Sequence, residues 1–193
     1  FGYNITESSE HTAEYVPWYI KSRFPELIKE FRIPIDEYLR RCRSSIEKWK
    51  TLSKELARNA KLRHDTRTAE YGSHIIEAME TDKPVQIGGN VLNTGLITNL
   101  PPNCCVEVPC MVDRSGIRPC YVGDLPEQCA AINRTNINVQ QLTIEAALTG
   151  KREYIYYAAM LDPHTAAELP VDKIRAMCDD LIKAHGKMLP RYK

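Results

Sequence analysis

The chain has 193 residues, with 26 Lys and Arg against 25 Asp and Glu, so its net charge is +1. This balance offers no basic surface for nucleic acid, and the apolar runs stay well short of the roughly 20 residues of a membrane-spanning helix. Seven cysteines without a regular framework predict a cytoplasmic protein rather than a secreted disulfide scaffold. A start on Phe1, without a Met, suggests a piece of a longer protein.

The first patterned segment is TESSEHTAEYVPWY, residues 6–19, which combines a capping sequence with reactive side chains. A Thr or Ser near its start can cap a helix whose first turns carry Glu. In such a helix His11 and Tyr15 stand at i and i+4 on one face, with Glu7 or Ser8 one turn earlier. An imidazole or phenol so placed can act as a general base when a nearby cation or metal lowers its pKa. The same spacing is common on packed helices, so both interpretations stay open.

The segment 35–60 has the strongest periodicity in the chain. Its apolar side chains recur at spacings of three, four and seven residues: Ile35, Leu39, Cys42, Ile46, Trp49 and Leu56. Charged residues occupy the other faces. The pattern predicts an amphipathic helix of about seven turns, with Pro34 near its first turn.

A second helix is predicted over 68–81, and the pattern then changes. The stretch KPVQIGGNVLNTGLITNLPPN is rich in Gly, Pro and Asn, which predicts a short strand over 85–87 and a long ordered loop after it. Asn93 and Asn99 lie on this loop, where an amide can hold a polar substrate or simply close a turn.

Residues 104–112 alternate as a half-buried strand does. One face carries Cys104, Val106, Val108, Cys110 and Val112. Cys104 and Cys105 then point to opposite faces, and no C-x-x-C pair is present, so we interpret Cys104 and Cys110 as core residues rather than zinc ligands. The turn DRSG leads to a further short strand around 120–122.

From Pro126 onward the sequence is helical, with breaks near Gly150 and over 163–170. In the first of these helices Asn136 and Thr143 fall close to the apolar stripe, so their polar groups need partners. A neighbouring subunit, a buried loop, a ligand or ordinary helix–loop hydrogen bonds would each serve. The last helix carries a stripe of Ile174, Met177, Leu181, His185 and Met188. The whole predicts an α+β domain, with long helices packed on a small, mostly antiparallel sheet.

Four stretches together resemble the C-terminal part of glycoside hydrolase family 4. They are TESSEHTAEYVPWY, TAEYGSHIIEAME, NVLNTGLITNLPPNCCVEVPCMVDRSGIRPCYVGDLPEQCAAINRTNINVQQLTIEAALTG and AMLDPHTA. The resemblance is to the branch of α-glucosidases, α-galactosidases and α-galacturonidases, and it covers nearly all of residues 1–193. It implies the C-terminal substrate-binding and oligomerisation domain of such an enzyme, in a fold like that of lactate and malate dehydrogenases.

The resemblance also implies unusual chemistry, since this NAD-dependent family does not use the usual pair of carboxylates. In the family, NAD⁺ oxidises C3 of the sugar, a base removes the acidified C2 proton, the aglycone leaves from C1, water adds and the ketone is reduced. A divalent metal, usually Mn²⁺, polarises the oxygens at C2 and C3. The sequence lacks the G-x-G-x-x-G fingerprint and the family's metal-binding stretch. The NAD and Mn²⁺ sites are therefore expected in an N-terminal Rossmann domain outside this chain, which alone should be inactive.

For the site itself, the resemblance points to the first segment and to the loop. Laid on the tyrosine that serves as C2 base in the phospho-glycosidase branch, His11 is the first candidate for the base and Tyr15 the second. Glu7, Ser8 and Asn99 are expected to contact the sugar, and no residue of this chain is expected to bind metal or cofactor. The expected partners are an α-glycoside or uronide, the Rossmann domain and further copies in a homo-oligomer, a dimer or tetramer.

Arg67, Glu70 and Tyr71 are weaker candidates, equally expected to pack the 68–81 helix. A different class of function also stays open: a non-catalytic interaction or dimerisation domain whose Asn-rich helix and apolar stripes pack against a partner. Release of nitrophenol from a nitrophenyl α-glycoside by the full-length protein would discriminate between the two.

Overall fold

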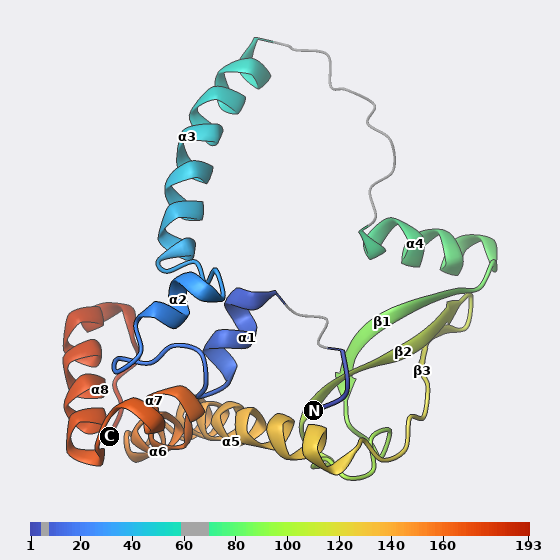
Figure 1. Cartoon of the computed structure of the whole chain (residues 1–193). Helices are drawn as coiled ribbons and strands as arrows, with labels where there is room; N and C mark the ends of the chain where they lie inside the picture. The colour runs from blue at the N-terminus through green and yellow to red at the C-terminus, as the bar shows by residue number, and fades with distance from the viewer. Residues whose placement is uncertain (5–7, 59–69) are drawn as a thin grey trace.

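The computed structural model describes residues 1–4, 8–58 and 70–193 (Figure 1). Within these ranges it contains α-helices, one 3-10 helix and three strands, and it confirms the predicted α+β fold. In chain order the elements are α1 (Ser9–Tyr15), α2 (Glu26–Glu30), α3 (Glu37–Ala57), α4 (Tyr71–Thr81), β1 (Val85–Leu92), β2 (Cys105–Asp113), β3 (Gly116–Pro119), α5 (Glu127–Thr149), α6 (Glu153–Leu161), α7 (Pro163–Glu168), α8 (Val171–His185) and η1 (Gly186–Met188).

The sheet has the order β1-β2-β3, and both strand pairs are antiparallel, as predicted. The register of β1 and β2 runs from Val85 opposite Val112 to Leu92 opposite Cys105. The alternation predicted for 104–112 is confirmed, because every residue of its apolar face is buried, whereas Cys105 and Glu107 on the other face are exposed.

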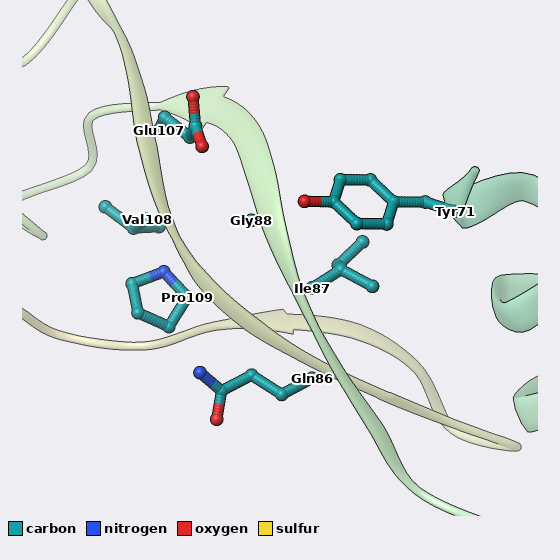
Figure 2. A pocket seen from close by; sticks show the side chains of 7 residues that line it. All are labelled: Tyr71, Gln86, Ile87, Gly88, Glu107, Val108 and Pro109. Carbon is teal, nitrogen blue, oxygen red and sulfur yellow. The ribbon is translucent and has the colours of Figure 1, made fainter. Parts of the chain in front are cut away.

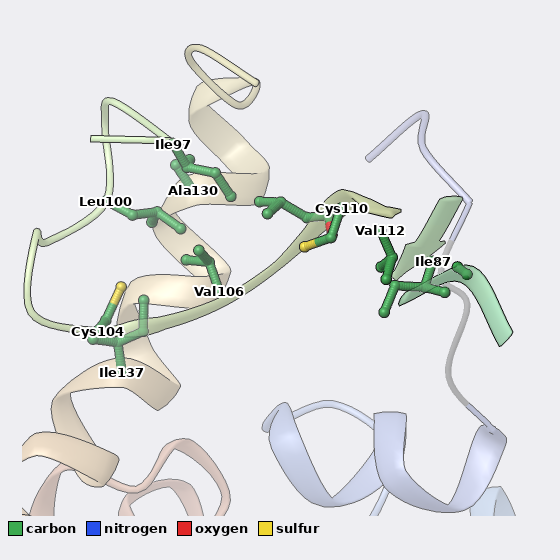
Figure 3. Close-up of a cluster of buried hydrophobic side chains, with 11 residues drawn as sticks. Ile87, Ile97, Leu100, Cys104, Val106, Cys110, Val112, Ala130 and Ile137 are labelled. Atoms are coloured by element: carbon green, nitrogen blue, oxygen red, sulfur yellow. The ribbon is translucent and has the colours of Figure 1, made fainter. Parts of the chain in front are cut away.

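The core lies against this apolar face of the sheet (Figure 3). Helix α5 contributes Ala130 and Ile137, and the loop between β1 and β2 contributes Ile97 and Leu100. Removal of these apolar surfaces from water is the main force that holds the sheet, the loop and α5 together.

Two strand predictions were wrong in their bounds. The strand predicted over 85–87 continues to Leu92, because Gly88 and Gly89 belong to the sheet rather than to a loop. The strand predicted around 120–122 is instead β3, which begins at Gly116, where φ is 108°, directly after the turn at 114–115. A two-residue turn lets the chain pair again at once, so the pairing ends before Cys120.

Asn93 organises the loop that follows β1. Its side chain is fully buried, and its Nδ2 lies 2.9, 3.1 and 3.0 Å from the carbonyl oxygens of Ile97, Leu100 and Pro101. Its Oδ1 accepts the N–H of Ile97 at 3.0 Å. A buried amide must be satisfied in this way, so Asn93 closes the loop rather than binding a substrate.

The predicted helix over 35–60 is confirmed as α3, although it begins at Glu37 because Asp36 takes a left-handed conformation with φ of 58°. The helix predicted over 68–81 is confirmed from Tyr71, and residues 68 and 69 lie outside the described ranges. None of the residues of α3 is buried.

The C-terminal helices break near Gly150 as predicted, but most of the break predicted over 163–170 is instead the short helix α7. Gly150 ends α5 in a left-handed conformation with φ of 68°, and the Asp162 side chain caps α7 by accepting the N–H of Thr165 at 2.7 Å. The stripe predicted for the last helix is buried only in part: Ile174 is buried, whereas Leu181 is exposed, and the exposed Met188 belongs to η1 rather than to α8. The buried residues of α8 are Ile174 and Cys178, one turn apart. Within the described ranges, no helix is both long and apolar enough to cross a membrane.

Candidate functional site

Helix α1 places the predicted base on its outer face. Ser8, in an extended conformation, caps the helix by accepting the N–H of His11 on its Oγ at 3.4 Å. Ala13 and Val16 turn inward and are buried. The period of the helix therefore leaves His11 and Tyr15 together on the opposite, solvent-facing side.

The two rings lie together as the spacing predicted. Their centroids are 6.3 Å apart, and their planes are inclined by 21°. Nδ1 of His11 lies 3.1 Å from Oε2 of Glu14, a contact that the sequence analysis missed although a spacing of three residues on a helix favours it. The His11 side chain is 38% exposed and Tyr15 is 50% exposed. Neither ring is sealed in the core, and their chemical role stays a prediction.

Contacts from α5 and α3 hold α1 in place. Asn136 on α5 donates its Nδ2 to the carbonyl of Tyr15 at 3.2 Å. On the other side, Nη2 of Arg41 on α3 donates to Oε2 of Glu10 at 3.3 Å, and Glu10 is otherwise buried. Thr143 donates to the carbonyl of Val139 within its own helix. Of the alternatives left open for Asn136 and Thr143, the observed bonds are ordinary helix and loop bonds.

The three predicted sugar contacts have different outcomes. Glu7 lies outside the described residues. Ser8 is the cap of α1. Asn99 donates to the carbonyl of Leu125 at 2.8 Å and accepts the N–H of Leu125 at 3.0 Å, which joins the loop to the start of α5. Ser8 and Asn99 thus have structural bonds, and their contact with a sugar stays a prediction.

A hollow of about 280 Å³ lies beside the sheet and the start of α4 (Figure 2). The Tyr71 phenol faces it, and Tyr71 is half exposed rather than packed under its helix. A Cβ on Gly88 would lie 2.8 Å from Oε1 of Glu107, so the glycine leaves space for that carboxylate. Arg67, the companion candidate, lies outside the described residues. Neither His11 nor Tyr15 lines this hollow.

A second hollow, of about 400 Å³, lies between α6 and α8. Beside it, Asp179 accepts hydrogen bonds from the Tyr156 hydroxyl at 2.5 Å and from Nη2 of Arg152 at 2.6 Å. The hydrogen bond from Tyr156 is the main cause of a lowered pKa of Asp179, and the pKa of Tyr156 is raised by the same bond. Residues 23 and 27 positions apart in the chain form this cluster, so no local pattern could have predicted it.

Among the described residues, no three His, Cys, Asp or Glu side chains are grouped so that they could hold a metal ion. All seven cysteines are free thiols. Cys104 and Cys110 are buried in the core, which confirms their interpretation as core residues. Burial also raises the pKa of the Cys104 thiol, which makes it a poorer ligand or nucleophile.

Comparison with known proteins extends these observations. The family described as "Family 4 glycosyl hydrolase C-terminal domain" matches residues 1–165. An α-galactosidase of Bacillus subtilis is 61% identical over 193 residues, which is 100% of this chain and 44% of that enzyme. The chain therefore spans less than half the length of this relative.

Two solved structures share the fold. The crystal structure of the Bacillus subtilis protein lplD superposes with a TM-score of 0.76 at 20% identity, over 89% of this chain and 38% of that one. A 6-phospho-α-glucosidase from gut microorganisms, crystallised with NAD and Mn²⁺, has a TM-score of 0.62 at 23% identity, over 73% of this chain and 31% of that one. At these identities the likeness concerns the fold alone.

Proposed function

Because this chain belongs to the family 4 glycosyl hydrolases and matches their C-terminal domain, we propose that it is the substrate-facing and oligomer-forming part of an NAD- and Mn²⁺-dependent α-galactosidase. The choice of galactose as the sugar is supported by the 61% identity over the whole chain to an α-galactosidase. The other two substrates of the branch that the sequence resembles are an α-glucoside and a galacturonide. They differ from the galactoside by one stereocentre or one carboxylate.

In the proposed reaction, this chain contributes a general base, His11. The contact of Nδ1 with the Glu14 carboxylate favours the tautomer with its proton on Nδ1, so Nε2 is the basic nitrogen. We assign to Nε2 the removal of the proton from C2 of the sugar. Tyr15, whose ring stacks on the imidazole, is the second candidate for this role. Ser8 and Asn99 are proposed as contacts to the sugar hydroxyls, beside their structural bonds.

The cofactors are assigned to the rest of the protein. The described residues contain no fitting group of metal ligands, and the sequence contains no dinucleotide fingerprint. A structural neighbour was crystallised with both NAD and Mn²⁺. We therefore place both sites in an N-terminal Rossmann domain, and we propose a cytoplasmic homo-oligomer. No step of the reaction is assigned to a metal held by this chain.

The test uses the whole protein that carries this chain, with NAD⁺, Mn²⁺ and the nitrophenyl α-glycosides of galactose, glucose and galacturonic acid. The galactoside is expected to release nitrophenol fastest. His11→Gln should lower kcat by about 10²–10⁴-fold, the usual contribution of a general base. Tyr15→Phe should lower it by a comparable factor only if the phenol is the base.

Matched controls are His185→Gln, at the end of α8, and Tyr121→Phe, in the segment between β3 and α5, since both residues are exposed and lie outside α1. If activity survives both His11→Gln and Tyr15→Phe, neither residue of α1 is the base that removes the C2 proton. Absence of hydrolysis of all three glycosides by the whole protein would instead favour the non-catalytic interaction domain.

A further inference from the structure

Helix α3 presents an apolar stripe that no described residue covers. Four of its large side chains lie along one side with high exposed fractions: Leu39 at 52%, Ile46 at 58%, Trp49 at 61% and Leu56 at 44%. Isolated apolar residues on a surface are normal, but a continuous stripe of this length marks an interaction site.

The helix leaves the rest of the chain at its first turns (Figure 1). Glu37 and Arg41, in those turns, carry the ion pairs at its base, and Arg41 reaches Glu10 of α1. Beyond them α3 extends away from the other helices and the sheet. Most of the stability of such a helix in a protein comes from packing of its apolar face, so the stripe requires an occupant.

The spacing of the stripe is that of a coiled coil. Leu39, Ile46 and Ser53 are seven residues apart and form one row, and Cys42, Trp49 and Leu56 form the second row three residues further on. Alternation of three- and four-residue steps lets two helices pack knobs into holes along their whole length. The occupant is therefore expected to be another helix with the same repeat.

We propose that α3 pairs in parallel with α3 of a second copy of this chain. Parallel pairing sets identical residues face to face, and it brings Tyr38 beside the second copy's Arg43 and Ser45 beside the second copy's Lys50. No like charges then meet along the flanks of the stripe. Antiparallel pairing would instead bring Arg43 beside the second copy's Lys50, two cations whose repulsion opposes that arrangement.

The proposal deepens the proposed self-association and rests on it, but not on the proposed chemistry. Its test is the mass of the whole protein in sedimentation equilibrium. Ile46→Glu should halve the mass, because it buries a carboxylate at the centre of the paired stripe. Thr51→Glu, on the opposite face of the same helix, should leave the mass unchanged. Ile46 is exposed in the single chain, so Ile46→Glu should lose at most the helical circular dichroism of α3, whose packing it removes, and Thr51→Glu should match the unchanged protein.

A cross-link reports the orientation. In the parallel pair Cys42 faces the second copy's Cys42, so mild oxidation should give a disulfide-linked dimer that Cys42→Ser abolishes, in a background where the exposed Cys105 is Ser. A link formed only with Ser53→Cys added, between positions 42 and 53, would overturn the parallel orientation.

The remaining outcomes overturn the assignment and separate it from the enzyme hypothesis. If the whole protein sediments as a monomer, both the proposed self-association and the proposed role of α3 are wrong. An oligomer whose mass Ile46→Glu does not change would end the role of α3 alone. Hydrolysis of the galactoside tests the proposed function independently of either mass.

Discussion

Gly89 on β1 and Cys110 on β2 share one space in the buried face of the sheet. A Cβ on Gly89 would lie only 2.6 Å from Sγ of Cys110, whose side chain is fully buried. Atoms do not approach so closely without displacement, so the absence of a side chain at residue 89 is what allows the thiol to sit in the core.

Gly89→Ala should therefore lower the free energy of unfolding by about 1–3 kcal/mol, the usual cost of overpacking a core. Urea denaturation measures the change. Adding Cys110→Ala removes the clashing sulfur and should recover part of the loss. Gly72→Ala, with no atom within 4 Å of its new Cβ on α4, should be neutral or gain up to about 1 kcal/mol. Equal effects at residues 72 and 89 would contradict the explanation.

Asn93→Ala should destabilise the protein strongly. The substitution leaves the N–H of Ile97 and several loop carbonyls without their buried partner, and each such group costs about 1–3 kcal/mol. Thermal or urea unfolding measures the loss. Asn90→Ala, at an exposed position of β1, is the matched control. If both variants lose the same stability, the buried amide does not organise the loop.

The base of α3 should lose stability in acid. Hydrogen bonds from Arg40 and then Arg41 lower the pKa of Glu37 from 4.5 to about 2. Because the folded pKa is the lower one, this contribution is complete above pH 4.5 and disappears as the pH falls through about 2. A carboxyl titration by NMR should find the low value.

Glu37→Gln is the variant that checks this effect on stability. It should flatten the acid dependence of the free energy of unfolding between pH 4.5 and about 2. Glu55→Gln, on the same helix and exposed, should keep the dependence of the unchanged protein. An unaltered slope in Glu37→Gln would show that another group controls it.

Glu14→Gln tests whether the carboxylate orients His11. A hydrogen bond of this kind contributes about 1 kcal/mol, so kcat of the whole protein should fall about fivefold. Glu14→Asp, which keeps a carboxylate at this position, should recover part of the loss. Glu30→Gln on α2 is the control. An unchanged kcat in Glu14→Gln would show that the carboxylate does not orient His11.

The sequence predicted those parts of the fold in which a local repeat coincides with burial. The alternation of 104–112 identified the buried face of β2 correctly, because each second residue of a half-buried strand meets the core. The Gly88–Gly89 pair was interpreted as a loop because glycine usually interrupts strands. Within β1, Gly89 leaves the space that the Cys110 thiol occupies, and no local pattern indicates such a contact between residues far apart in the chain.

The site was predictable to the same degree. The shared face of His11 and Tyr15 follows from the helical period alone. The donation from Asn136 to the carbonyl of Tyr15 spans 121 positions, and no local pattern indicates such a bond. The stripe of α3 was predicted, but its exposure was not, since a repeat shows which side chains gather and never what covers them.

Asn93, Asn99 and Asn136 act in series from the sheet to α1. The first fixes the loop after β1, the second ties that loop to the start of α5, and the third ties α5 to the end of α1. Cooperative opening of one segment should therefore loosen the next. A sugar bound at α1 would slow deuterium uptake as far away as the Ile97 amide, so protection of that amide would report occupancy of the site.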